Sequence, residues 1–293
     1  MTVSSRARFR DVVRQEPGNL GLACLLLAAE VDPELDVDAQ LATLDRLAVS
    51  ARPVVYPAVA GGPAAGPSAT GPSPIPAGSP LELRAMAEGM RNALGGREGF
   101  HGRPEDYKYL RSSLLPEVLH TRRGLPILLS VVWLEVARRL GVPTYPVGLP
   151  GHVVVGIGVP GESVLVDPFD GGRIITVHEA AEKVRATGTP FTRGLLAPLP
   201  PADLLMRVLT NIRVLAARTE KPRTKLWAVE LSLLLPHHSV SLRRERGDLL
   251  IQLGDFPGGA TELEAFAGAV ESVEPAAAAA ARRSARTARA RLN

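Results

Sequence analysis

The chain has 293 residues, of which 45% are hydrophobic and 22% are charged, a balance typical of a globular protein with one large or two ordinary domains. A single cysteine excludes an intramolecular disulfide and a cysteine-based metal cluster. The net charge of +4 is concentrated near the C-terminus, in a segment without acids that contains Arg282, Arg283, Arg286, Arg289 and Arg291. The basic balance therefore does not indicate a nucleic-acid-binding face on a folded domain, and no nucleic-acid partner is expected.

Neither the longest apolar run nor the N-terminus suggests a membrane segment. The run LGLACLLLAA, from Leu20 to Ala29, is about half as long as the ~20 residues of a membrane-spanning helix. The polar start MTVSSRARFRD leads into no apolar signal-peptide region. We therefore expect a cytoplasmic protein without a membrane partner.

The first 80 residues divide into two parts by composition. Residues 1–56 carry apolar side chains at helical spacing and are expected to form an N-terminal helical segment, in which Asp36 or Asp38 could cap the second helix. Residues 57–80 are almost wholly Pro, Gly, Ala and Ser, so they can bury little apolar surface. We expect them to be a flexible insertion.

Residues 81–199 combine helices with short β-branched runs. After LELRAMAEGMRNAL, with helical periodicity, and a glycine-punctuated loop, the stretch RRGLPILLSVVWLEVARRLGVP predicts a helix that begins after a turn and ends at a glycine and a proline. TYPVGL, HVVVGIG and SVLVDPF follow as predicted strands, and VPGE joins the last two in an antiparallel hairpin. A helix followed by an antiparallel sheet predicts an α+β fold.

No strand pattern is present beyond residue 200. Residues 200–275 contain four helical stretches, ADLLMRVLTNIRVLAAR, TKLWAVELSLLL, SLRRERGDLLIQL and GATELEAFAGAVESV, which predict an all-helical domain built from tetratricopeptide-like pairs. Residues 276–293 are an Ala/Arg run, for which we expect a basic tail in the form of a frayed, solvated helix.

The central segment resembles a known family. The residues REGFHGRPEDYKYLRSSLLPEVLHTRRGLPILLSVVWLEVARRLGVPTYPVGLPGHVVVGIG, followed by VDPFDGG, are similar to the SirB-type transglutaminase-like family, and the flanking helical stretches match its N-terminal segment and its tetratricopeptide-like C-terminus. The resemblance implies a transglutaminase/papain-like core in which a helix packs on an antiparallel sheet. The chain departs from the family at Ser112, where an asparagine is usual before the serine at position 113.

In active relatives with this core, the nucleophilic cysteine lies two residues after a glycine at the start of the helix. Counted from Gly124, that position is Pro126, which carries no nucleophile and is favoured in the first turn of a helix. Cys24 lies among apolar neighbours, where we expect a small buried side chain. The resemblance thus implies that classical cysteine-dependent transglutaminase or protease activity is absent.

The histidine and aspartate of the family triad are retained as His152 and Asp167, on successive predicted strands. In the full triad the histidine takes the proton of the nucleophile and the aspartate fixes the tautomer of the histidine. The alternative is that both residues belong to turns, with Asp167 capping backbone groups. Ser130, one helical turn after Pro126, could replace the thiol as nucleophile or could bond to a backbone carbonyl.

Four further side chains flank the same helix start. Tyr107, Tyr109, Arg122 and Arg123 could line a pocket for an anionic or peptide ligand, or could fix turns. His237 and His238 have no companions at metal-ligand spacing, and no glycine-rich phosphate loop is present, so neither a metal nor another cofactor is expected.

These observations leave two hypotheses open. The favoured one is a transglutaminase-like protein without the nucleophile, which binds a peptide or protein partner through its cleft or its helical domain. The other is an acyl-transfer or hydrolytic enzyme in which the pair His152 and Asp167 works with Ser130, a water or a nucleophile of the substrate.

Overall fold

The computed structural model describes residues 3–15, 19–56 and 79–291. They form two compact units, one made of Met1–Gly18 with Leu205–Asn293, and the other of Asn19–Leu204. The residues predicted as an N-terminal segment are therefore divided between the two units. The predicted insertion lies outside the described residues, except for Ser79 and Pro80, which begin a helix.

Four α-helices of the unit Asn19–Leu204 start at side-chain caps. Asp36, rather than Asp38, accepts a hydrogen bond from Ala39 N at the start of its helix, and Ser79 and Glu82 form a capping box. Before the sheet, the chain forms α2 (Leu20–Ala28), α3 (Val37–Val55), α4 (Pro80–Met90), the π-helical turn η1 (Arg91–Arg97), the 3-10 turns η2 (Pro104–Lys108) and η3 (Leu110–Ser113), α5 (Leu115–Thr121) and α6 (Pro126–Leu140).

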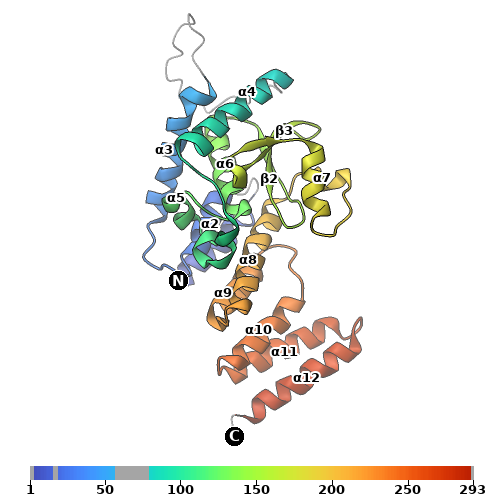
Figure 1. The fold of residues 1–293 in the computed structure, drawn as a ribbon. Helices are drawn as coiled ribbons and strands as arrows, with labels where there is room; N and C mark the ends of the chain where they lie inside the picture. The colour runs from blue at the N-terminus through green and yellow to red at the C-terminus, as the bar shows by residue number, and fades with distance from the viewer. Residues whose placement is uncertain (1–2, 16–18, 57–78, 292–293) are drawn as a thin grey trace, which may run out of the picture. The chain divides into compact units, whose positions relative to one another are not determined.

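Helix α6 is the centre of this unit (Figure 1). It begins with Pro126 at its first position and ends at Gly141, whose φ of 78° is the left-handed cap that glycine favours. Every residue of α6 is buried except Arg138 and Arg139. A helix that is apolar on nearly all sides must be enclosed by other elements, which explains why its start is held firmly in the unit.

The sheet is antiparallel, with strand order β1-β2-β3-β4, and confirms the α+β fold. Val155 of β2 pairs with Val166 of β3, and Gly161 turns the predicted hairpin with a φ of 95°. The strands are β1 (Thr144–Val147), β2 (Val154–Val159), β3 (Glu162–Asp167) and β4 (Arg173–Ile175), of which the three-residue β4 was not predicted.

Both faces of the sheet are covered. Consecutive residues of β2 point to opposite faces, and those from Val154 to Gly158 are all buried. Helix α7 (Val177–Arg185) contributes Ala180 and Val184 to an apolar cluster with residues of β1 to β4, while α6 contacts β1 and β2. Two 3-10 turns, η4 (Pro168–Asp170) and η5 (Arg193–Leu196), complete the unit.

The described residues of the other unit form helices joined by turns and include no strand. It contains α1 (Val3–Val12), most of α8 (Pro201–Arg218), α9 (Pro222–Ser232), α10 (Ser241–Gln252), α11 (Phe256–Val270) and α12 (Pro275–Ala290). Helices α10, α11 and α12 stack in chain order, as in a helical repeat (Figure 1).

The C-terminal Ala/Arg run differs from its expectation as a frayed, solvated helix. Helix α12 buries one alanine face, formed by Ala278, Ala281, Ala285 and Ala288, against Leu263, Phe266 and Ala267 of α11. Arg282 also pairs with Glu271, at 2.7 Å. Small side chains let the two helices approach closely, so the run is packed and not solvated on all sides.

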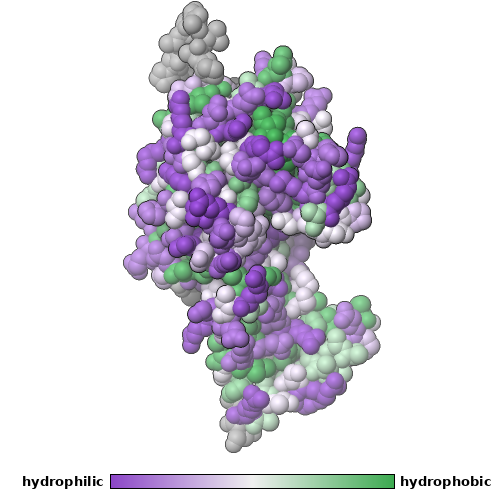
Figure 2. Space-filling model, in the orientation of Figure 1, coloured by the Kyte–Doolittle hydropathy of each residue, from purple (hydrophilic) through white to green (hydrophobic). Residues whose placement is uncertain are grey.

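None of the described helices combines the length and the apolar character that a bilayer crossing requires. Hydrophilic residues cover most of the face seen in Figure 2, and apolar residues occur there in separate patches. Singly exposed apolar residues such as Leu81 and Val273 are ordinary for a folded protein.

Candidate functional site

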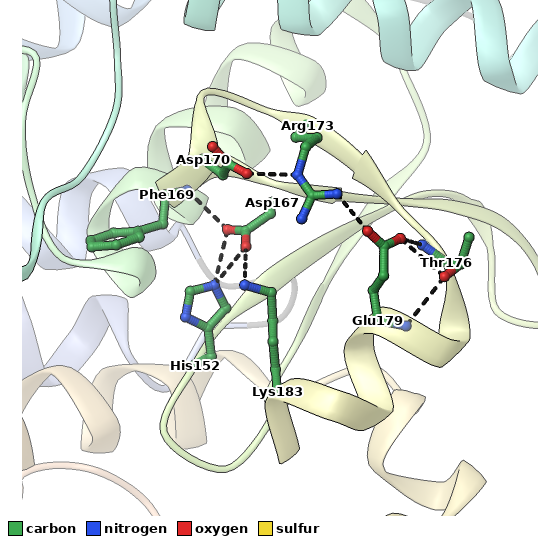
Figure 3. Close-up of polar contacts among 8 residues, drawn as sticks. All are labelled: His152, Asp167, Phe169, Asp170, Arg173, Thr176, Glu179 and Lys183. Atoms are coloured by element: carbon green, nitrogen blue, oxygen red, sulfur yellow. Dashed lines mark hydrogen bonds and ion pairs between the residues drawn. The ribbon is translucent and has the colours of Figure 1, made fainter. Parts of the chain in front are cut away.

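The structure brings His152 and Asp167 together (Figure 3). Nε2 of His152 lies 2.9 Å from Oδ1 and 3.0 Å from Oδ2 of Asp167. Asp167 ends β3 and is fully buried, while His152 precedes β2 and keeps 13% of its side chain exposed. The aspartate is thus a fixed internal group, and the histidine connects it with the surface.

Two further donors contact the Asp167 carboxylate. Phe169 N donates to Oδ1 at 3.1 Å, so the residue also makes the turn contact that was the alternative to a His-Asp pair. Lys183 Nζ lies 3.0 Å from Oδ2. Lys183 was not among the residues expected at the site, because no motif marks it and α7 brings it there only through tertiary packing.

The start of α7 is fixed independently (Figure 3). Thr176 and Glu179 form a capping box, and Arg173 bonds to both Glu179 and Asp170. Lys183 follows Glu179 by four residues and so lies one turn further along the same helix face. This arrangement directs the lysine toward the carboxylate.

The Asp167 carboxylate is held in its charged form. Burial raises its pKa, but the hydrogen bond from His152 and the positive charges of His152 and Lys183 outweigh burial and bring the pKa below its usual range. An ionised carboxylate accepts only, so Nε2 of His152 donates to it. The aspartate therefore fixes the orientation of the histidine ring.

Phe169 supports the histidine from the side. The Phe169 ring lies edge-on to the His152 ring, with the two centroids 5.8 Å apart. The Tyr107 ring is tilted against the Phe169 ring, with those two centroids 6.3 Å apart. Gly102 N donates to Phe169 O at 2.9 Å, and a Cβ at position 102 would fall 1.9 Å from the phenyl ring. A glycine is therefore required for this close approach, which fixes Phe169 and with it the histidine.

The two nucleophile candidates occupy other surroundings. Cys24 lies in α2 and is 1% exposed; burial, together with the negative charge of Glu135, raises the pKa of its thiol to about 12. Ser130 is fully buried, and its hydroxyl donates to Val153 O at 3.3 Å. Ser130 therefore contacts the backbone next to His152 rather than its ring.

The flanking tyrosines are exposed. Tyr107 and Tyr109 have exposed fractions of 42% and 46%. Arg111 lies over the Tyr109 ring, with its guanidinium carbon 4.7 Å from the ring centroid. Both rings keep enough open surface to contact a ligand.

The flanking arginines are engaged within the chain. Arg122 adopts a left-handed backbone with a φ of 60°, lies over the Phe100 ring and pairs with Glu98 at 3.1 Å. Arg123 pairs with Asp106 at 2.9 Å. These contacts correspond to the turn-fixing alternative for the arginines.

Two family models match parts of the chain. Residues 39–210 match the family model of the transglutaminase-like superfamily. The chain belongs to this superfamily. A tetratricopeptide repeat model matches residues 212–293, so the resemblance seen in the central motifs and in the C-terminal helices is confirmed.

Several proteins are similar to this transglutaminase-like chain. The UPF0162 protein of Xylella fastidiosa is 34% identical over 194 residues, which are 64% of this chain and 67% of that protein. A UPF0162 protein of Pasteurella multocida is 33% identical over 180 residues, 60% of this chain and 67% of the relative. Human F-box only protein 21 is 29% identical over 147 residues, 47% of this chain and 23% of that protein. No solved structure matches the chain.

Proposed function

We propose that this protein is a binding or scaffold module in which the transglutaminase-like core holds a peptide or protein ligand beside His152, without thiol chemistry. The observation that carries the proposal is the start of α6, where Pro126 is the first residue of the helix. By the resemblance to the family, this is the position of the nucleophile in active relatives. The raised pKa of buried Cys24 supports it, because a thiol of this kind is neither ionised nor reachable.

The surroundings of His152 suit a peptide. The exposed rings of Tyr107 and Tyr109 combine an apolar face with a hydroxyl, a combination enriched at protein interfaces. His152 adds a polar group that can bond to a peptide amide or hydroxyl. Tetratricopeptide repeats generally mediate protein–protein contacts, which supports a partner for the helical unit as well.

A second candidate, acyl transfer or hydrolysis, is favoured by the state of Asp167. Keeping a fully buried carboxylate charged costs free energy. Here His152, Lys183 and the backbone N of Phe169 all contact the charged carboxylate. The same arrangement lets His152 act as a base toward a water or a nucleophile of the substrate. Ser130 is a weaker choice of nucleophile since its hydroxyl bonds to Val153 O.

One experiment separates the two candidates. Wild-type protein and the His152→Ala variant are assayed for turnover of a panel of ester, thioester and glutamine-amide substrates. The binding proposal expects equal background rates for the two proteins. Turnover that disappears in His152→Ala but persists in Cys24→Ala would replace it by the enzymatic candidate.

The ligand surface is tested separately with peptides selected from a displayed library on the wild-type protein. Tyr107→Ala should weaken their binding about tenfold or more, the effect of truncating an aromatic anchor. Val159→Ala, at an apolar position of β2 with a similar exposed fraction of 40%, is the matched control and should leave binding unchanged. Equal effects of both variants would contradict a site beside His152.

A further inference from the structure

The helical unit contains a cavity of about 390 Å³, and none of the residues that line it belongs to the His152 site. Segments far apart in the sequence meet there, because α1 contributes residues together with α9, α10 and α11. The polar lining residues are Arg6, Arg10, Glu230, Arg243, Arg246 and Glu262.

Arginines occupy all four carboxylate oxygens of the cavity. Glu230 accepts from Arg6 at 2.7 Å through one oxygen, and from Arg246 at 3.0 and 3.1 Å through the other. Glu262 accepts from Arg246 at 2.6 Å and from Arg243 at 3.3 Å. The two acids are 16% and 12% exposed, so they form the floor, whereas the arginines reach the open side.

The cavity carries more positive than negative charge. Four guanidinium groups face two carboxylates, which leaves an excess of two positive charges. Arg10 contributes to this excess without contacting either carboxylate; its ion pair, at 3.6 Å, is with the exposed Asp11 on its own helix. Such exposed pairs are weak and screened by solvent, so Arg10 is available to a stronger anion.

We propose that this cavity binds the phosphate monoester group of a small molecule. A phosphate monoester carries a charge of about −1.5 to −2 at neutral pH, which matches the excess, whereas a carboxylate or a sulfate ester would neutralise only half of it. Planar guanidinium groups bind phosphate oxygens through paired hydrogen bonds.

The rest of the lining fits an organic group. Ala7, Leu233 and Leu234 provide apolar wall beside the arginines. The volume lies within the range of roughly 300 to 1,000 Å³ that is typical of small-molecule sites and leaves room beyond the phosphate itself. The ligand is therefore a small organic phosphate and not an extended polyanion.

Arg243 and Arg246 are held in place before any ligand arrives. Arg246 bonds to both Glu230 and Glu262, and Arg243 is held by Glu262. Ordering a long side chain on binding costs about 0.5–1.5 kcal/mol, and here the acids at the floor have already imposed that order. If these contacts served only to join α1 to α9, the bond from Arg6 to Glu230 would be sufficient. That role does not explain why Arg10 and Arg243 also line the cavity.

The charge of the ligand is tested by calorimetry on the full-length protein. Phenyl phosphate is titrated at about pH 8, above the second phosphate pKa of about 6. Phenyl sulfate, with the same shape and one charge less, is the matched probe. Phenyl phosphate should bind one to one and at least about tenfold more tightly than phenyl sulfate, and addition of salt should weaken its binding.

Neighbouring arginines provide the control for position. Arg10→Gln and Arg243→Gln should each weaken phenyl phosphate binding about tenfold or more, since a hydrogen bond to a charged group contributes at least that much. Arg8→Gln and Arg244→Gln remove the same charge from the same helices but outside this cavity, and should change binding less than about twofold. Unchanged circular dichroism verifies folding, and if Arg243→Gln alone is unfolded, the Arg10 variant decides.

Three results would overturn the proposal. One is the absence of any heat of binding with phenyl phosphate at concentrations up to about 10 mM, which would mean that the dissociation constant is well above 1 mM. The arginines would then be a structural connection only. Another is an equal loss in the control variants, which would indicate general attraction to a basic surface. The third is binding of a phosphoserine peptide at least about tenfold tighter than phenyl phosphate, which would identify a protein ligand in place of a small molecule.

Discussion

Two buried carboxylates in the unit Asn19–Leu204, Glu135 and Asp167, have similar electrostatics and different surroundings. Glu135 is 3% exposed and accepts from Gly21 N at 3.0 Å, from Arg138 at 3.0 Å and from Arg139. For both acids burial raises the pKa, and hydrogen bonds and neighbouring positive charges outweigh burial, so that each pKa lies below its usual range.

The difference lies in the partners. Glu135 is bound by two arginines of its own helix, which never lose their charge, and by the first turn of α2, so it joins two helices permanently. Asp167 is bound by His152, whose side chain is partly exposed and reaches the surface. The comparison teaches that two buried carboxylates whose pKa values shift in the same direction can differ in whether a partner side chain is accessible from outside.

The largest effect should come from acid, which acts on both carboxylates at once. Each group binds fewer protons in the folded than in the unfolded chain, so the free energy of unfolding rises with pH. Their contributions are complete above the unfolded pKa values, about 3.9 for Asp and 4.3 for Glu, and are lost as the pH falls through the lower folded values. Urea unfolding at about pH 7, 5 and 3 measures this loss. If the double variant Glu135→Gln, Asp167→Asn shows the same change of the free energy of unfolding with pH as the wild type, these two carboxylates are not the source of that change.

Removal of Glu135 should be the most damaging single change. Glu135→Ala leaves Arg139, which is 13% exposed, without its buried partner and should lower the free energy of unfolding by about 3–5 kcal/mol. The control is Arg138→Gln, since Arg138 is 58% exposed and should contribute less than about 1 kcal/mol. In urea unfolding, Glu135→Ala should lower the midpoint concentration and leave the dependence of the free energy on urea concentration unchanged.

Asp167→Asn should lower the free energy of unfolding less than Glu135→Ala does. It also distinguishes the binding proposal from the enzymatic alternative. An amide keeps the size of the side chain but leaves Lys183 and His152 without a charged acceptor, which predicts a loss of about 1–3 kcal/mol. In the binding proposal, affinity for a selected peptide changes only as far as folding does. In the enzymatic alternative, turnover falls by orders of magnitude while the fold is retained, because the histidine loses its tautomer. Lys183→Met tests the stability contribution without touching the histidine.

Substitution of Cys24 should have the smallest effect on stability, and its thiol reports on the charge of Glu135. Cys24→Ala removes one buried sulfur and should cost about 1 kcal/mol, with peptide binding unchanged. In the folded wild type, a thiol-directed reagent should react slowly because the thiol is buried and its pKa is about 12. Since part of that rise comes from the charge of Glu135, Glu135→Gln should speed the reaction. A fast reaction in the folded wild type would mean that the thiol is accessible.

Local sequence patterns were enough for the elements that frame the site. Pro126 and Gly141 delimit α6 as the stretch from Arg122 to Pro143 predicts, because proline and glycine impose those backbone angles by themselves. The VPGE hairpin and the α+β class follow from similarly local preferences. Residues 152 and 167 came together because a hairpin joins β2, which begins shortly after His152, to β3, which ends at Asp167.

Features that depend on distant residues could not be found this way. The partner of Glu135 on α2 is 114 positions away, and Lys183 reaches Asp167 only because α7 packs on the sheet. The alanine face of α12 has no strong hydrophobic pattern, and its burial depends on the shape of α11. Small apolar residues and long polar side chains acquire their roles from tertiary structure, which a local pattern does not contain.

The contact between Arg6 and Glu230 has a consequence for synthesis of the chain. The two residues are 224 positions apart, so at about 5–20 residues per second α1 leaves the ribosome about 10 to 45 s before its partner on α9 exists. All residues of the unit Asn19–Leu204 are made in that interval. During translation, α1 and its Phe9, which is buried in the folded chain, therefore remain without their final packing surface until α9 has been made.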